Sequence, residues 1–463
     1  MRKLIVLAAF TALTITSTHA GGLMTNTNYH IAFDRMMARG ASFDIDATFS
    51  NPAGLAWGHE GWQLSLNFQK PWQNRDINYA GTKYEGVASA PIVPALFASY
   101  KHDRWAVSGM IGIVGSGGFV KYDNGVPMFN VLLGSVVTGL TQQLNQKTGG
   151  FAPVVSPDQF DSEMKGKQYI YGGQVNFTYK ILDCLSAAAG FRANYYDGYY
   201  RGHVKANHST IGNLASLSLD VDQKGWGFTP IVSLNFHKGP LTLTARYEFR
   251  TKIETKNETN SLSATLNSEQ LIEAPLVKLV AAGKLPAEQA AAMVTQIKST
   301  VEGGLATYTA PYQDGARTRY DMPVLLSVAA GYEFTPKLRA TLEYHFFDDK
   351  NAKMANDRQN ELTHGTHEFL AGVKYGINDK FTVSCGGQRT DYGLSDGYQQ
   401  NTSFACDSYS IGLGGAWNIN EKVRLNAGYF ISLYSDYDKQ ASYGTETYSR
   451  TNNVIGLGID YKF

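Results

Sequence analysis

Along much of the chain, large apolar residues alternate with polar or small ones. In residues 241–250, leucine, alanine, tyrosine and phenylalanine hold the odd positions, and threonine, arginine and glutamate hold the even ones. Residues 337–348 and 421–434 alternate in a similar way. A period of two is typical of β-strands with one apolar and one polar face. The chain is therefore predicted to consist mainly of strands.

Fourteen strands result when this pattern is followed to the end of the chain. Many exceed the mean globular strand of about 5–6 residues and approach the roughly 9–11 residues that a tilted strand needs to cross a bilayer. An even strand number is typical of bacterial outer-membrane barrels. The predicted strands are 62–69, 91–100, 105–119, 168–181, 184–197, 226–237, 240–252, 320–334, 337–348, 367–376, 380–391, 404–417, 421–434 and 450–463.

The connections between these strands alternate in length. Every second one is short, as at 182–183, 238–239 and 335–336, and most of the others are longer. Two long ones carry helical segments, near 127–145 and 268–301. Short periplasmic turns and long outer loops are the arrangement of outer-membrane barrels. We therefore predict an all-β fold, a 14-stranded antiparallel transmembrane β-barrel with helical extracellular loops.

Charged residues within the strands support a barrel with a polar lumen. A charge on the lipid-facing side costs about 2–4 kcal/mol at mid-depth, and charges such as Arg192, Glu343 and Arg424 take the polar parity. The alternative is a soluble all-β protein with an inward apolar face. The polar face of these strands carries too many charged residues to be buried easily in a sandwich core. This favours the barrel.

The N-terminal region does not alternate. Residues 1–20 have a positive start, an apolar run and small residues at the end, which predicts a secretory signal peptide. Residues 21–57 are expected to form a free tail, a periplasmic extension or a plug, and 58–463 the barrel. The net charge of +1 gives no reason to expect a nucleic-acid partner. Three cysteines are too few for a disulfide framework, although one pair could form.

Short motifs precede the first strand: Arg39-Gly40-Ala41, Asp46-Ala47 and above all Asn51-Pro52-Ala53-Gly54-Leu55. They resemble the FadL/TodX family of outer-membrane transporters for long-chain fatty acids and hydrocarbons. With the fourteen strands and the C-terminal Phe463, the resemblance covers the whole mature chain. It implies that residues 21–57 form a hatch inside the barrel, with Asn51, Pro52, Ala53 and Gly54 at its exit. The alternative is that Asn51-Pro52 is only a turn.

The third predicted strand is rich in glycine at Gly115, Gly117 and Gly118. Clustered glycines inside a strand mark a bulge, a kink or a close approach. The family resemblance implies an inward kink here that opens the barrel wall. A tight turn at 101–104 would place Pro91 and Pro94 opposite this strand, where they donate no ladder hydrogen bonds. We therefore expect a lateral gate, the alternative being an ordinary glycine-rich strand end.

Two further sets of residues are candidates for ligand contact. Arg246, Arg250 and Arg339 offer forked donors for a carboxylate; the alternative is that they pair with Glu248, Glu343 or Glu368 to hold the plug. An apolar capture loop is expected in the outer segment after the third strand, because exposed apolar helices need a partner. The alternative is that it packs with residues 268–301 as a lid. Its residues are Met128, Phe129, Leu132 and Leu133.

These features predict passive, ligand-gated uptake of hydrophobic small molecules, most of all long-chain fatty acids, across the outer membrane of a Gram-negative bacterium. The alternatives are a general diffusion porin and a barrel enzyme acting on lipid or peptide. The sequence shows no enzymatic motif in context, and we expect no cofactor or metal. The expected partners are the hydrophobic ligand, outer-membrane lipid and, through Phe463, the barrel-assembly machinery, with the chain as a monomer.

Overall fold

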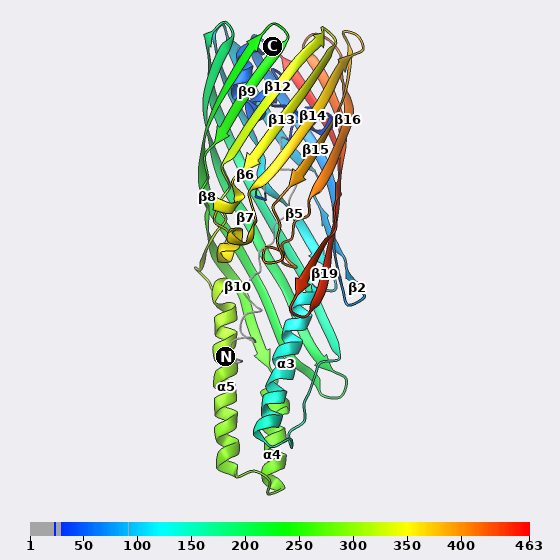
Figure 1. Cartoon of the computed structure of the whole chain (residues 1–463). Coiled ribbons are helices and arrows are strands. Elements are labelled where there is room, and N and C mark those ends of the chain that lie inside the picture. The colour runs from blue at the N-terminus through cyan, green and yellow to red at the C-terminus, as the bar shows by residue number, and fades with distance from the viewer. Residues whose placement is uncertain (1–22, 25–28, 91) are drawn as a thin grey trace.

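A computed structural model describes residues 23–24, 29–90 and 92–463; the predicted signal peptide at 1–20 lies outside this range. The described residues form the predicted antiparallel barrel of fourteen strands, closed by pairing between the first and last strands (Figure 1). Several barrel strands are interrupted and appear as more than one segment. The segments are β1 (Gly61–Tyr79), β2 (Thr82–Tyr84), β3 (Gly86–Ser89), β4 (Val93–His102), β5 (Trp105–Tyr122), β6 (Gln159–Leu182), β7 (Leu185–His208), β8 (Gly212–Lys238), β9 (Leu241–Glu248), β10 (Glu254–Leu266), β11 (Arg317–Arg319), β12 (Leu325–Thr335), β13 (Leu338–Phe347), β14 (Thr366–Gly376), β15 (Phe381–Asp391), β16 (Ser408–Asn418), β17 (Val423–Tyr434), β18 (Tyr437–Ala441) and β19 (Gly444–Lys462).

Helices occur inside the barrel and in the loops at one end of it (Figure 1). None of the helices in the described residues is both long and apolar enough to span a bilayer. The helical segments are α1 (Ile31–Arg35), α2 (Ala47–Ser50), η2 (Pro52–Trp57), α3 (Pro127–Lys147), η3 (Glu269–Glu273), α4 (Ala274–Ala281), α5 (Ala287–Thr309), η4 (Ala310–Tyr312), η5 (Asp349–Asn351) and η6 (Ala355–Glu361).

The alternating pattern sorts the two faces of the wall. In β1, Trp62, Leu64 and Leu66 are exposed on the outside, whereas Gln63 and Ser65 are buried within. Successive side chains of a strand point to opposite faces, so one parity meets the membrane and the other meets the lumen. Hydrocarbon cannot satisfy backbone polar groups, and the closed ladder leaves no edge exposed to it.

The strands near the long loops are longer than predicted. The segment predicted at 226–237 belongs to β8, which begins at Gly212, and β6 and β7 extend in the same direction. In these extensions the outward face is polar, and Arg201 there forms ion pairs with Asp220 and Asp222. The inward face carries buried apolar residues such as Val204 and Val221. Apolar residues on the outward parity require a lipid-facing side, so that pattern ends where the strands leave the membrane.

The N-terminal segment, here called the hatch (residues 29–57 of the described chain), lies inside the barrel, as the family resemblance implies. Its helix α1 contacts β1, β15, β16, β17 and β19, and η2 contacts β5 to β8. The lumen is therefore filled by the chain's own N-terminal region rather than by barrel side chains alone.

Candidate functional site

The hatch helix α1 packs directly on the backbone of the barrel wall. An added Cβ at Gly412 would lie 2.3 Å from the carbonyl oxygen of Asp34, and one at Gly456 would lie 2.3 Å from its Oδ2. Real Cβ atoms do not approach other atoms this closely. Glycine is therefore required at Gly412, where the close atom is backbone, whereas a side chain at Gly456 would displace the Asp34 carboxylate. Gln69 Nε2 donates a 2.5 Å hydrogen bond to Asp34 Oδ1 and fixes the helix from β1.

The predicted hatch motif hydrogen-bonds to three strands. Asn51 Nδ2 donates to Asn235 Oδ1 at 3.1 Å, and the Ala53 amide donates to Ser233 Oγ at 3.0 Å. The carbonyls of Pro52 and Ala53 accept from the hydroxyl groups of Thr178 and Ser186, at 2.9 and 2.6 Å. Gly54 is confined, since a Cβ there would lie 2.5 Å from the carbonyl oxygen of Ser42. The motif therefore attaches the exit of the hatch to β6, β7 and β8.

The hatch is also held together internally. Arg39 forms a bidentate pair with Asp46, at 2.7 Å from Nε to Oδ2 and 2.9 Å from Nη2 to Oδ1. The next residue, Gly40, donates its amide to Glu343 Oε2 at 2.7 Å. Paired buried charges avoid the cost of burial without a partner. The Arg39-Gly40-Ala41 and Asp46-Ala47 motifs therefore meet in one bonded unit against β13.

A cluster of buried charged side chains faces the hatch from the wall. Arg192 and Arg246 both pair with Glu248, the latter at 2.9 Å from Nη2 to Oε1. His345 lies between two carboxylates, 2.7 Å from Glu343 and 2.9 Å from Glu368. Removing one partner of such a group leaves an uncompensated buried charge, which costs about 3–5 kcal/mol. Each charged side chain of this cluster therefore has at least one oppositely charged or hydrogen-bonding partner.

A small cavity separates the hatch from this cluster. Its volume is about 40 Å³, close to that of one water molecule at roughly 30 Å³. The lining combines apolar and ionic groups, but the space cannot hold an extended ligand unless the hatch moves. It is lined by Phe33, Met37, Arg39, Phe49, Ser50, Val114, Arg192, Arg246, Glu248, Leu325, Glu343, His345 and Phe347.

The glycine-rich part of β5 lies where the wall loses its pairing. β4 pairs with β5 as far as Leu96↔Ile111, and β3 resumes with Ala88↔Val120. Among the described residues, Gly112 to Phe119 has no partner on that side. On its other side, the ladder to β6 shifts register on both sides of Gly115. The predicted gate residues Gly115, Gly117 and Gly118 all lie in this unpaired stretch.

The first described residues of the chain lie against this stretch. Met24 is fully buried, and a Cβ at Gly115 would lie 2.5 Å from its carbonyl oxygen. The Leu23 amide donates a 3.2 Å hydrogen bond to Asp349 Oδ1 in η5. Leu23 and Met24 belong to an apolar cluster with Phe97, Val114 and other lumenal residues. Leu23 and Met24 thus lie on the lumenal side of the stretch of β5 that lacks a partner toward β4, here called the wall gap.

The three arginines predicted as carboxylate partners have different surroundings. Arg246 Nη1 donates to the carbonyl oxygen of Phe49, and Arg339 Nη2 donates to that of Ala41. Both therefore bind the hatch in this state, which agrees with the alternative that lumenal arginines hold the plug. Arg250 is exposed and donates to the carbonyl oxygen of Asn351 at 2.7 Å.

The predicted capture loop is the helix α3. Phe129, Leu132 and Leu133 are buried, and Met128 is partly buried. Phe129 and Leu133 belong to a cluster with Leu271 and Leu276 of the other helical loop. The two loops therefore pack on each other, which is the lid arrangement that the sequence left open.

Two features of the site were not singled out from the sequence. Asp349 accepts a hydrogen bond from the amide of Leu23, 326 residues away in the sequence, and no local sequence pattern predicts such a contact. His345 shares the lumenal parity of β13 with Glu343, and that alternation is the signal that could have placed it in a charged cluster.

Comparison with known proteins gives the fold its context. Residues 277–463 match the family model "Outer membrane protein beta-barrel domain", and no curated protein sequence matches. A Pseudomonas aeruginosa FadL homologue superposes with a TM-score of 0.63 at 14% identity, covering 96% of this chain and 100% of that one. The toluene transporters TodX of P. putida and TbuX of Ralstonia pickettii give TM-scores of 0.54 and 0.52, each at 12% identity, with 90% of this chain and 94% of theirs covered. The chain therefore has the fold of the FadL/TodX transporters, a fourteen-stranded barrel of the bacterial outer membrane with its N-terminal segment inside.

Proposed function

We propose that this chain takes up hydrophobic small molecules, with long-chain fatty acids as its substrates, by passive transport through the lumen and out between β4 and β5. The observation that supports this proposal is the stretch Gly112 to Phe119 of β5. It lacks a partner on the β4 side, and Leu23 and Met24 cover it from within. A ligand that displaces those two residues meets an apolar cluster behind it and membrane in front of it.

The lining of the lumenal cavity supports an amphiphilic substrate. Phe33, Phe49 and Phe347 supply apolar surface, and Arg192 and Arg246 supply cations. A displacement of the hatch that enlarges the cavity also removes the Phe49 carbonyl from Arg246 and frees this donor for a carboxylate. Burial of a tail of about 14 carbons contributes roughly 11 kcal/mol, at about 0.8 kcal/mol per CH₂. That energy is sufficient to offset the loss of several hatch contacts.

The helical lid fits the capture step of this proposal. Its apolar core includes Phe129, Leu133 and Leu276, and a hydrophobic molecule that parts α3 from α4 would replace those contacts. The two relatives described as toluene transporters support a hydrophobic cargo but leave its class open. The general porin needs an open lumen, and the hatch fills it in the described residues.

Uptake of labelled oleate and labelled toluene by outer-membrane vesicles tests the proposal. We expect oleate uptake that the double variant Gly117→Val/Gly118→Val reduces about tenfold, with the barrel still folded by heat-modified mobility on gels. Gly173→Val is the matched control, since a Cβ there meets nothing within 4 Å. Unchanged oleate uptake in the folded double variant would refute the lateral gate. Uptake of toluene without oleate would refute the fatty-acid substrate.

A further inference from the structure

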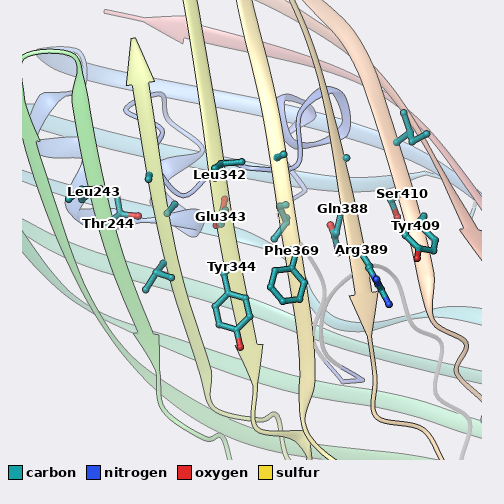
Figure 2. Close-up of a pocket in the computed structure, with 17 residues that line it drawn as sticks. Leu243, Thr244, Leu342, Glu343, Tyr344, Phe369, Gln388, Arg389, Tyr409 and Ser410 are labelled. Atoms are coloured by element: carbon teal, nitrogen blue, oxygen red, sulfur yellow. The ribbon is translucent and has the colours of Figure 1, made fainter. Parts of the chain in front are cut away.

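A groove of about 910 Å³ lies in the outer wall of the barrel, across β9 and β12 to β16 (Figure 2). Its exposed side chains belong to the membrane-facing parity; Leu342, Phe369 and Ile411 are 66%, 57% and 55% exposed. Pockets that hold drug-sized ligands have volumes of about 300–1,000 Å³. The groove is therefore as large as the pockets of drug-sized ligands, and it lies outside the proposed transport path.

Strand pairing explains its shape. One row across the sheet is formed by Leu243, Ala330, Leu342, Ala371, Gly387 and Ile411, so three of its six positions hold alanine or glycine. The next row toward the helical loops has larger side chains, which form a raised edge above the small ones. That row is Val328, Tyr344, Phe369, Arg389 and Tyr409.

Arg389 is the unusual member of this edge. It takes the lipid-facing parity of β15 and is exposed, although a charge on that face costs about 2–4 kcal/mol at mid-depth. Its guanidinium lies 5.5 Å from the ring centre of Tyr409. Among the residues that the structure describes, no carboxylate lies within ion-pairing distance of Arg389, and Asp391 on the same face is 3.7 Å from His364 instead.

The position of Arg389 along the barrel axis places it at the level of the outer leaflet. It stands eight residues after Phe381, the start of β15 at the end with the short turns. At about 3.4 Å per residue and a tilt of about 40°, it lies roughly 20 Å above that residue, in an apolar band about 25 Å tall. An arginine at this depth can place its aliphatic carbons along the apolar surface and its guanidinium in the headgroup layer.

We propose that this groove binds lipid A, the phosphorylated and multiply acylated glycolipid of the outer leaflet. Arg389 donates to a lipid phosphate, and the row of small residues receives acyl chains. Arginine matches phosphate with a bidentate fork, and basic sites at the membrane surface recognise anionic headgroups. A groove that crosses six neighbouring strands fits a lipid with several acyl chains better than one with two.

Native mass spectrometry of the purified protein, titrated with hexa-acyl lipid A in detergent, tests this site. We expect Arg389→Gln to weaken lipid A binding about tenfold, as for the loss of one charge-assisted hydrogen bond. Ala371→Trp, which fills the groove without changing charge, should weaken it as well. Arg104→Gln is the control, because it removes one partly exposed arginine at the opposite end of the barrel.

Two further lipids discriminate the sources of phosphate. Dephosphorylated lipid A should bind wild type and Arg389→Gln equally, and phosphatidylglycerol should bind both weakly. Equal lipid A binding by Arg389→Gln and Arg104→Gln would overturn the proposal. An equal preference of the wild type for phosphatidylglycerol would overturn the assignment to lipid A. Gel mobility before and after heating establishes that each variant is folded.

Discussion

Leu23 donates its backbone amide to the carboxylate of Asp349 at 3.2 Å, so the start of the described chain is attached to the loop between β13 and β14. The other oxygen of Asp349 accepts from the amide of Thr366 at 3.3 Å. One buried carboxyl group therefore connects the segment that covers the wall gap to an outer loop.

The attachment should depend on pH. Burial raises the pKa of the Asp349 carboxyl to about 7, above its ordinary value of about 3.9. The folded state therefore holds a proton that the unfolded state loses, so this contribution to stability is complete below about pH 4 and is lost as the pH rises through 7. We expect the urea midpoint to fall between pH 5 and pH 8, and to fall less in Asp349→Asn. Asp183→Asn, in a turn where this side chain is 97% exposed, should keep the wild-type slope. Equal slopes in all three proteins would contradict this account.

A side chain at Gly115 should displace the N-terminal segment. In Gly115→Val, the new Cβ would lie 2.5 Å from the Met24 carbonyl oxygen and 2.9 Å from Ile170 Cδ1. Hydrogen exchange of the peptide that contains residues 23–35 should be faster than in the wild type. The control Gly173→Val should leave that exchange unchanged. An unchanged exchange rate in Gly115→Val would contradict the contact between the N-terminal residues and β5.

The close contact of α1 with the wall should not tolerate a side chain. Gly412→Val places a Cβ against the Asp34 carbonyl oxygen, and such overpacking costs about 1–3 kcal/mol. We expect the hatch to loosen while the barrel remains closed. Liposome swelling with small sugars reports this: the wild type should exclude them and the variant should admit them. Gly415→Val, where the nearest atom to a Cβ is a carbonyl oxygen at 3.0 Å, is the milder comparison.

Removal of Arg246 should destabilise the lumen. Arg246→Met deletes a partner of buried Glu248 and the donor to the Phe49 carbonyl. Breaking a buried ion pair costs about 3–5 kcal/mol. Arg192 still pairs with Glu248 in this variant and compensates part of its charge. We expect a loss near the lower end of that range in urea unfolding. Arg250→Met, at an exposed position, should change stability by less than about 0.5 kcal/mol.

The sequence predicted the membrane wall well because lipid imposes a strict rule. Each strand there must present apolar residues outward and can present polar ones inward, as Trp62 and Gln63 do. The rule stops at the membrane surface, and so the outer parts of β6, β7 and β8 escaped the pattern. There the outward face is polar, with ion pairs such as Lys205 with Asp161, and the apolar residues face inward, as Val204 and Val221 do.

Register and tertiary contacts were harder to predict. The predicted turn at 101–104 implies that Pro94 lies opposite Ile111, but the hairpin closes at His102↔Trp105 and pairs Leu96 with Ile111. The predicted register is therefore wrong by two residues, since the turn contains Asp103 with a φ of +49°; Pro91 lies outside the described residues. The hatch partners of Arg246 and Arg339 depend on contacts between distant segments, which no local pattern encodes.

The long strands beyond the membrane determine where a cargo first meets this protein. β8 begins at Gly212, fourteen residues before the exposed Trp226, and this length corresponds to roughly 35 Å of height at about 3.3 Å per residue and a tilt of about 40°. The helices α3, α4 and α5 lie at the far end of this extension (Figure 1). In the transport that we propose, a water-insoluble molecule that enters there would cross the saccharide coat of the cell within protein, and so would avoid the hydrated sugar layer that excludes such molecules from the bilayer.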